Sequence, residues 1–153
     1  MSPYDLDEVD KQILTYIQED ARFTATGLAE RVGVSDNTIH HRLDDLEEAG
    51  VITGYRTTLD PDEIGLSLYF LFVCTVPISR RAEVAAQVRD FPEVVEVTEL
   101  MTGQRNLLVK VVGAEDEDIT HLATRLDELD LEIDDENMIR AEYSRPLEVV
   151  ELG

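Results

Sequence analysis

The sequence predicts an α+β chain of two domains, a helical domain over residues 1–60 and a βαββαβ domain over residues 61–153. In the first part, apolar residues recur at helical spacing, whereas the second part alternates β-prone runs with helical patterns. The turn-rich segment LDPDEIG, residues 59–65, separates these two textures. We therefore place the domain boundary there.

Two helices are predicted before residue 34. The first runs from about residue 7 to residue 19, and Asp5 or Asp7 is positioned to cap its start. Thr24 or Thr26 is positioned to cap the second helix. Each helix has one apolar face, so we expect both to pack into a shared core.

A third helix follows after a tight turn. Gly33 suits the left-handed backbone that ends the second helix, and Ser35 suits the N-cap of the third. Gly50 terminates the third helix, and residues 51–59 are expected to be extended, as a short wing. Two helices joined in this way indicate a winged helix-turn-helix, a motif that places its second helix in the major groove of DNA.

The second domain is predicted to contain four strands and two helices. Their order, βαββαβ, is the ferredoxin-like plan, in which both helices cover one face of the sheet. The other face then needs a cover, and we expect dimerisation to provide it. The expected strands fall within residues 66–78, 94–101, 107–113 and 138–143, and the expected helices within residues 80–91 and 116–129.

The net charge of -21 opposes DNA binding, because contacts from Lys and Arg to phosphates normally dominate affinity for nucleic acids. The chain has 34 acidic and 13 basic residues, and its only lysines are Lys11 and Lys110. The acidic residues are spread over amphipathic helices, which resembles proteins of extreme halophiles such as haloarchaea. In molar salt the Debye length is about 3 Å, so repulsion between the protein and the phosphates is screened.

Other features exclude several classes of protein. No apolar run is long enough to span a bilayer, and the acidic N-terminus lacks the basic flank of a signal peptide. Cys74, the single cysteine, is expected to be a reduced core thiol in a cytoplasmic protein. With only three histidines, the chain predicts no metal site, and no residue pattern indicates a cofactor or a catalytic residue.

The chain resembles the Lrp/AsnC (feast/famine) family of transcriptional regulators over nearly its whole length. The matching segments, in order, are LDEVDKQIL (6–14), DARFT (20–24), LAERVGVS (28–35), RLDDLEEAGVITGY (42–55) and TGQRNLLVKV (102–111). The resemblance implies a DNA-binding winged helix-turn-helix and a C-terminal domain of the RAM type. It also implies homodimers, which often assemble into tetramers or octamers, and an amino-acid effector bound near the glycine loop between the second and third strands.

The candidate DNA contacts surround the third helix. Asn pairs in bidentate fashion with adenine and Arg with guanine, and unpaired amides at a helix N-terminus bind phosphate. For each of these side chains a structural role, as a cap or an ion-pair partner, stays open. The candidates are Ser35, Asn37, Thr38, His41 and Arg42 on the helix, and Arg22, Arg31 and Arg56 around it.

The candidate effector site is the loop TGQRN. The resemblance places an effector near this loop, where an arginine suits a carboxylate and an asparagine suits an amino or amide group. An exposed hairpin tip and a contact between dimers are the alternatives. The candidate residues are Thr102, Gly103, Gln104, Arg105 and Asn106.

The sequence departs from the family at two places. Many relatives are basic where this chain has Asp44 and Asp45, and the family loop often has an aspartate where this chain has Asn106. The leading hypothesis is a sequence-specific transcriptional regulator that responds to an amino acid or a related metabolite. One alternative is an effector-sensing or protein-interaction module with weak DNA binding, and another is an enzyme similar to the sirohaem decarboxylases, which share this two-domain plan.

Overall fold

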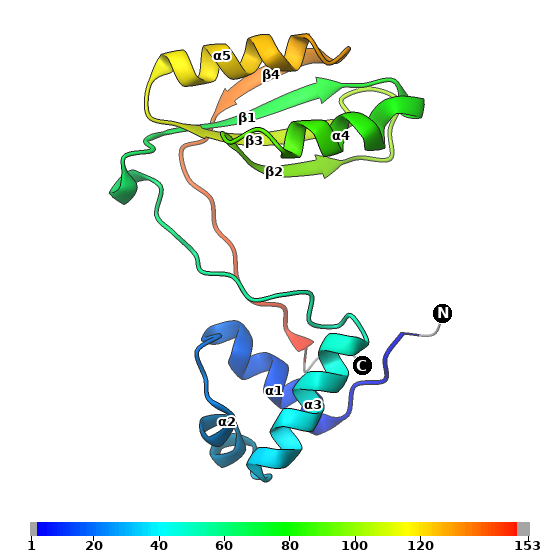
Figure 1. Cartoon of the computed structure of the whole chain (residues 1–153), viewed down its shortest axis with the longest axis vertical. Coiled ribbons are helices and arrows are strands. Elements are labelled where there is room, and N and C mark those ends of the chain that lie inside the picture. The colour runs from blue at the N-terminus through cyan, green and yellow to red at the C-terminus, as the bar shows by residue number, and fades with distance from the viewer. Residues whose placement is uncertain (1–2, 150–153) are drawn as a thin grey trace. The chain divides into compact units, whose positions relative to one another are not determined.

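The computed structural model describes residues 3–149 (Figure 1). The chain divides into two compact units, one formed by Met1–Thr58 with Tyr143–Gly153 and the other by Leu59–Glu142. None of the described helices is long and apolar enough to cross a bilayer. The first unit contains three helices, and the second contains a four-stranded sheet with helices. The predicted α+β class is therefore confirmed.

The first unit consists of α1 (Glu8–Glu19), α2 (Ala25–Val32) and α3 (Asp36–Glu48). The predicted caps are confirmed. The side chain of Asp7 accepts a hydrogen bond from the Asp10 amide, Thr24 from the Gly27 amide, and Ser35 from the Thr38 amide. These bonds satisfy amides that have no partner inside the helix, so each helix begins where its capping residue lies.

Two apolar clusters hold the first unit together. In one, α1, α2 and α3 contribute Ile13, Leu28 and Ile39, each almost completely buried. The other surrounds Leu14 and Leu46. No strand forms among residues 3–60, so the expected wing has no regular secondary structure: Val51 and Ile52 pack against the second cluster, and residues 53–59 are exposed.

The segment 143–149 belongs to the first unit, although the sequence had assigned it to the second domain. The side-chain Nε2 of Gln18 donates to the Leu147 carbonyl at 3.1 Å, and its Oε1 accepts from the Leu147 backbone amide at 2.8 Å. Val149 is only 7% exposed and packs with Leu14 and Leu46. The chain therefore uses residues close to its C-terminus to complete the core of the N-terminal unit.

We expect Val149→Ala to lower the free energy of unfolding by about 1–2 kcal/mol, because it removes two buried methyl groups and leaves a small cavity. Leu147→Ala is the matched control, because Leu147 is 72% exposed. Its backbone bonds to Gln18 survive the substitution. Guanidinium titration monitored by circular dichroism measures both variants, and equal midpoints for the two would contradict this role of Val149.

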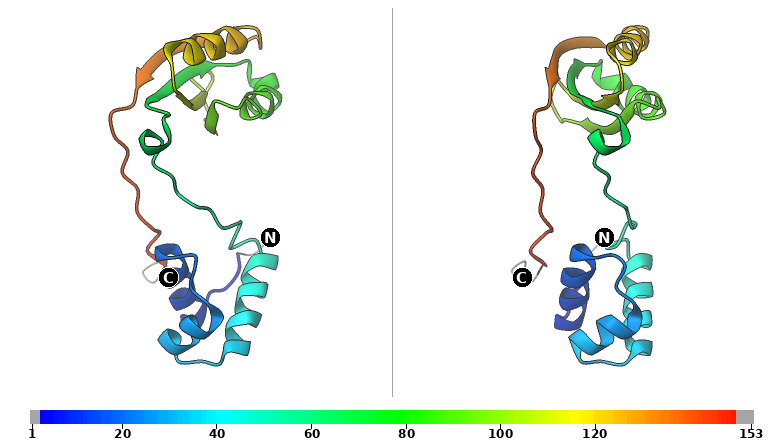
Figure 2. Two further views of the ribbon diagram at one scale, coloured as in Figure 1. Left: turned by 60° about the vertical axis from the view of Figure 1, so that its left-hand side comes forward. Right: turned by 90° about the vertical axis from the view of Figure 1, so that its left-hand side faces the viewer.

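The second unit is an antiparallel sheet with the strand order β2-β3-β1-β4. Its two helices, α4 and α5, lie on one face of the sheet (Figure 2). This arrangement is the predicted ferredoxin-like plan. The elements are β1 (Leu68–Thr75), α4 (Arg81–Arg89), β2 (Val94–Glu99), β3 (Leu107–Gly113), α5 (Asp116–Asp127) and β4 (Glu132–Met138), with short 3-10 turns at Asp62–Ile64 and Ile78–Arg80.

The prediction of the last strand was wrong: β4 covers Glu132–Met138 rather than residues 138–143. This strand pairs only with β1, so it lies at the edge of the sheet and is largely exposed. Its sequence, EIDDENM, is acidic, and only Ile133 packs against the core. Because an exposed edge strand needs few apolar residues, the hydrophobic pattern did not reveal it.

The core of the second unit lies between the sheet and the helices. Alternate strand residues such as Phe72, Leu107 and Val109 meet Leu122 of α5, and all four are fully buried. Cys74 is also fully buried, as predicted, and burial raises the pKa of its thiol to about 12. The thiol is therefore protonated at neutral pH and unreactive.

Candidate nucleic-acid interface and sensing loop

The turn between α2 and α3 has the geometry that a helix-turn-helix needs. Gly33 has a φ of 84°, a left-handed conformation that ends α2, and its amide bonds the Ala29 carbonyl. The Thr26 hydroxyl donates to the Asp36 carboxylate at 2.7 Å and so joins α2 to the start of α3. The two helices are thereby fixed relative to each other, with the N-terminal turn of α3 exposed.

The side chains of α3 divide into a buried face and an exposed face. Ile39 and Leu46 are completely buried, whereas Asn37 and His41 are exposed. Thr38 is partly buried, and its hydroxyl lies 2.9 Å from that of Ser35. Of the residues predicted on this helix, Asn37 and His41 are free to meet a ligand, while Ser35 and Thr38 form the cap.

Arg42 is turned away from that exposed face. Its guanidinium donates to the Asp7 carboxylate at 2.5 Å and to the Asp10 carboxylate at 3.3 Å, both at the N-terminus of α1. In the sequence, Arg42 is a candidate DNA contact, with an ion pair as the structural alternative. The structure makes it an ion-pair partner, and the pair links α3 to α1 rather than lying within α3.

This link explains a charged residue in the core. Asp10 is only 1% exposed, and burial raises the pKa of its carboxyl group, partly offset by the Asp7 amide and by Arg42. A hydrogen bond from the Asp10 amide, together with Arg42, holds the pKa of Asp7 below its usual value. The two carboxylates therefore keep Arg42 in place by charge-assisted hydrogen bonds.

Two more of the predicted phosphate contacts are occupied within the first unit. Arg22 forms two side-chain hydrogen bonds with Asp20, each 3.1 Å long, although its side chain is 90% exposed. The guanidinium of Arg31 lies over the ring of Phe23, 4.8 Å from its centroid, and also near Tyr16. Such a cation–π contact fixes the orientation of Arg31 at the surface of α2.

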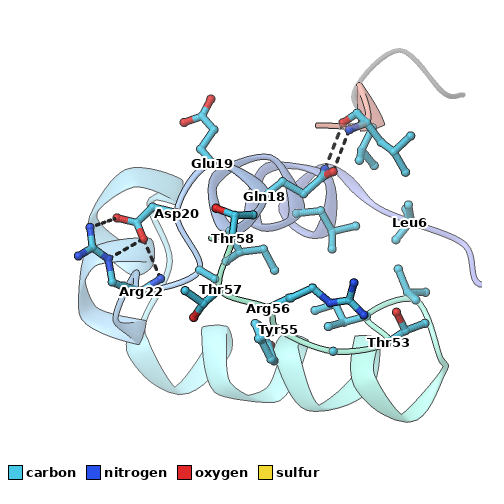
Figure 3. A pocket seen from close by; sticks show the side chains of 18 residues that line it. Leu6, Gln18, Glu19, Asp20, Arg22, Thr53, Tyr55, Arg56, Thr57 and Thr58 are labelled. Carbon is cyan, nitrogen blue, oxygen red and sulfur yellow. Dashed lines mark hydrogen bonds and ion pairs between the residues drawn. The ribbon is translucent and has the colours of Figure 1, made fainter. Parts of the chain in front are cut away.

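Arg56 lies in the exposed segment that follows α3. No ion pair holds it among the described residues, and it lines a cavity of about 700 Å³ in the first unit (Figure 3). Its lining includes the apolar side chains of Leu14, Ile17 and Val149. The four predicted arginines therefore have different surroundings: Arg42 binds Asp7 and Asp10, Arg22 binds Asp20, Arg31 lies over aromatic rings, and Arg56 is an exposed residue that lines the cavity.

The second candidate site is the loop between β2 and β3. Asn106, at its end, is completely buried. Its carbonyl oxygen accepts from the Val76 amide at 2.9 Å, and its NH₂ group donates to the Val76 carbonyl at 2.9 Å and to the Thr102 carbonyl at 3.2 Å. The side chain predicted to bind an effector therefore has its donors occupied, and it fastens the loop to the end of β1.

The other loop residues are exposed. Arg105 has a φ of 49°, and its amide donates to the Thr75 hydroxyl at 2.8 Å while its guanidinium bonds Asp135. The Thr102 hydroxyl donates to the Gln104 carbonyl. Gly103 has open space where a Cβ would lie, and its φ is outside the left-handed region. The turn therefore uses Arg105, rather than Gly103, as its left-handed residue.

Within residues 3–149, no three His, Cys, Asp or Glu side chains are grouped so that they could hold a metal ion. The two sites consist instead of hydrogen-bonding groups. The first is the exposed face of a capped helix after a helix-turn-helix. The second is an exposed loop whose backbone is held by one buried amide.

A family of winged helix-turn-helix DNA-binding domains matches residues 6–53. The fold and this match define the chain as a DNA-binding protein of the winged helix-turn-helix class. It is 32% identical over 116 residues to the HTH-type transcriptional regulator FL11 of Pyrococcus horikoshii, covering 76% of each chain. It is 35% identical over 114 residues to the leucine-responsive regulatory protein of Rhizobium meliloti, covering 71% of each.

The chain belongs to the Lrp/AsnC family of transcriptional regulators. A crystal structure of a transcriptional regulator from Neisseria meningitidis in complex with L-methionine superposes with a TM-score of 0.83, at 26% identity over 97% of this chain and 99% of that one. Escherichia coli AsnC shares the fold, with a TM-score of 0.79 over 95% and 99% of the two chains. Because these relatives are regulators, the prediction of a non-enzymatic protein is confirmed, and the alternative of a sirohaem decarboxylase is not retained.

Proposed function

We propose that this regulator recognises a specific DNA sequence and that an amino acid or related metabolite changes its occupancy of that site. The observation that carries the DNA part is the exposed face of α3, which presents Asn37 and His41 after a capped turn. Asparagine pairs with adenine through two hydrogen bonds, and each such contact contributes about 1–3 kcal/mol of discrimination. The amides at the N-terminus of α3 complete the site by binding a phosphate. Such a protein works in the cytoplasm.

A homodimer fits the open face of the sheet in the second unit. Strand residues alternate between faces, so Tyr69 and Leu71 of β1 point away from the helices, as Leu108 of β3 does, and all three are partly exposed. Burial of this apolar face against a second copy would stabilise a small domain. Two copies place two α3 helices in successive major grooves of a pseudo-palindromic site, about one helical turn or a multiple apart. Tetramers and octamers remain further candidates.

The exposed loop residues Thr102, Gly103, Gln104 and Arg105 are the proposed contacts for the effector. Arg105 offers a guanidinium for a carboxylate, at the cost of its bond with Asp135. Asn106 is assigned a supporting role, because its buried amide holds the loop to Val76. The regulator from Neisseria meningitidis was solved with L-methionine, which supports an amino acid as the class of effector.

We also propose that the protein works at high salt. The net charge of -21 repels phosphates at low ionic strength, and the predicted arginines are occupied or directed elsewhere. Screening in molar salt removes this repulsion over distances above about 3 Å. Base contacts then provide more of the affinity than phosphate contacts, so binding falls less with salt than it does for a basic repressor.

The shortage of free basic residues around α3 favours a second candidate, an effector-sensing module with weak DNA binding. The only basic residue of α3, if histidines are counted as neutral, is Arg42, which binds Asp7 and Asp10. Without phosphate anchors, a helix-turn-helix loses its main source of affinity. The DNA-binding experiment below separates the two candidates.

The test is a footprint of the full-length protein on its own promoter in molar potassium chloride, with and without each amino acid. We expect a protected site whose occupancy changes with at least one of them. Gly103→Gln should leave the melting temperature almost unchanged, since the position has open space, but should abolish the amino-acid response. No footprint in any condition favours the second candidate, and an unchanged response of Gly103→Gln removes the loop as the effector site.

A further inference from the structure

The exposed face of α3 carries a carboxylate but no lysine or arginine. Residues at positions i, i+3, i+4 and i+7 share one face of a helix, since each residue turns it by about 100°. On α3 these positions lie opposite the buried Ile39 and Leu46, and all four residues there are exposed. We call this set the groove stripe: Asn37, His40, His41 and Asp44.

Asp44 is free to bind a ligand. Among residues 3–149 its carboxylate takes part in no hydrogen bond and no ion pair. Two charged residues near it in the sequence are already engaged: Glu47 accepts a 2.8 Å hydrogen bond from Tyr55, and Arg42 binds Asp7 at the N-terminus of α1. The carboxylate therefore needs no rearrangement within the protein before it meets DNA.

A carboxylate in the major groove needs a hydrogen-bond donor. The base edges there offer two kinds, the N4 amino group of cytosine and the N6 amino group of adenine. Adenine also presents its N7 acceptor next to N6, which repels a carboxylate but suits the paired donor and acceptor of an asparagine. Guanine and thymine present no donor on this edge, so cytosine is the base that an aspartate accepts best.

We propose that Asp44 is a specificity-determining residue that reads the N4 amino group of a cytosine in each half-site. This inference rests on the proposed sequence-specific binding of DNA. The homeodomain, a three-helix variant of the helix-turn-helix, reads the major groove with recognition-helix residues at this same spacing. The acidic side chain then has two effects: it accepts from cytosine, and it rejects sites where an acceptor faces it.

Asp45 provides a matched control. It is exposed and carries the same charge, but it lies about 100° further round the helix than Asp44, outside the groove stripe. Asp44→Asn and Asp45→Asn each remove one negative charge, so they change the general attraction to phosphates equally. Only Asp44→Asn alters the groove stripe.

The experiment selects duplexes from a random library with full-length wild type, Asp44→Asn and Asp45→Asn in molar potassium chloride. We expect wild type and Asp45→Asn to enrich one motif with a cytosine in each half-site, and Asp44→Asn to prefer adenine there. On the selected site, replacing that C·G pair by T·A should weaken the wild type about 5- to 150-fold. The same replacement should affect Asp44→Asn much less.

Two results overturn the proposal in different ways. A motif that Asp44→Asn enriches unchanged, or that contains no preferred cytosine, contradicts the role of Asp44 while leaving sequence-specific binding intact. If the wild type enriches no sequence at any salt concentration, the proposed function fails and this inference fails with it. Equal melting temperatures of the three proteins verify that folding is not the cause of a difference.

Discussion

Arg42→Ala should lower the free energy of unfolding by about 2–3 kcal/mol. The substitution leaves the carboxylate of Asp10, which is 1% exposed, without its cation. The expected loss is below the range for fully buried pairs, because the Arg42 side chain is itself 31% exposed. Chemical denaturation at neutral pH measures this effect, and Arg22→Ala is the matched control. Arg22 is 90% exposed, so its loss should change stability by less than about 0.5 kcal/mol.

A second substitution, Asp10→Asn, separates the contribution of the buried charge to stability from that of the side chain's hydrogen bond. Asp10→Asn keeps an oxygen that accepts from the Asp7 amide but carries no charge. Combined with Arg42→Ala, it should recover about 1–2 kcal/mol, which a double-mutant cycle measures as coupling. If the two losses simply add, the link between α3 and α1 does not depend on the buried charge.

The pH dependence of Arg42→Ala follows from the same carboxyl group. Burial already raises the pKa of Asp10 in the folded wild type, and loss of Arg42 raises it further. A carboxyl group whose folded pKa exceeds its unfolded value binds protons more strongly when folded, so stability falls as pH rises. The difference between wild type and Arg42→Ala should therefore be largest at neutral pH and shrink as the pH falls through the pKa of Asp10.

The helical unit was predictable because its signals are local. Asp7, Thr24 and Ser35 cap their helices through bonds to amides only three residues away, and Gly33 adopts the left-handed conformation that ends α2. Such interactions depend on a few neighbouring residues, which the sequence displays directly. The order of strands and helices in the second unit was predictable for a similar reason, since apolar periodicity marks each buried element.

The roles of single polar residues were not predictable from local patterns. Arg42 meets Asp7 and Asp10 across 35 and 32 positions of sequence, and Gln18 meets Leu147 across 129. No periodicity indicates such pairs. One signal did exist: Asp10 faces the core side of α1, where an unpaired charge is costly, so a basic partner was needed. The same reasoning identifies Asn106 as a structural residue once its burial is known.

Asn106→Ala should lower the free energy of unfolding by about 2–4 kcal/mol, because it leaves the buried amide and carbonyl of Val76 without partners. Thermal or chemical denaturation of the full-length protein measures the loss. Gln104→Ala, in the exposed part of the same loop, should change stability by less than about 0.5 kcal/mol. A direct effector contact at Asn106 predicts the opposite pattern, with stability retained and only the amino-acid response lost.

Asn106→Asp tests whether the hydrogen bonds that the Asn106 side chain donates hold the loop to Val76. A carboxylate at this position still accepts from the Val76 amide, but it cannot donate to the carbonyls of Val76 and Thr102. Burial beside two acceptors raises the folded pKa of the introduced carboxyl group above its unfolded value, so this variant should be least stable at neutral pH. Its stability should recover as the pH falls and the protonated group donates to one carbonyl. A variant equally stable at all pH values would mean that the loop opens to water, and that the donors of Asn106 do not hold it.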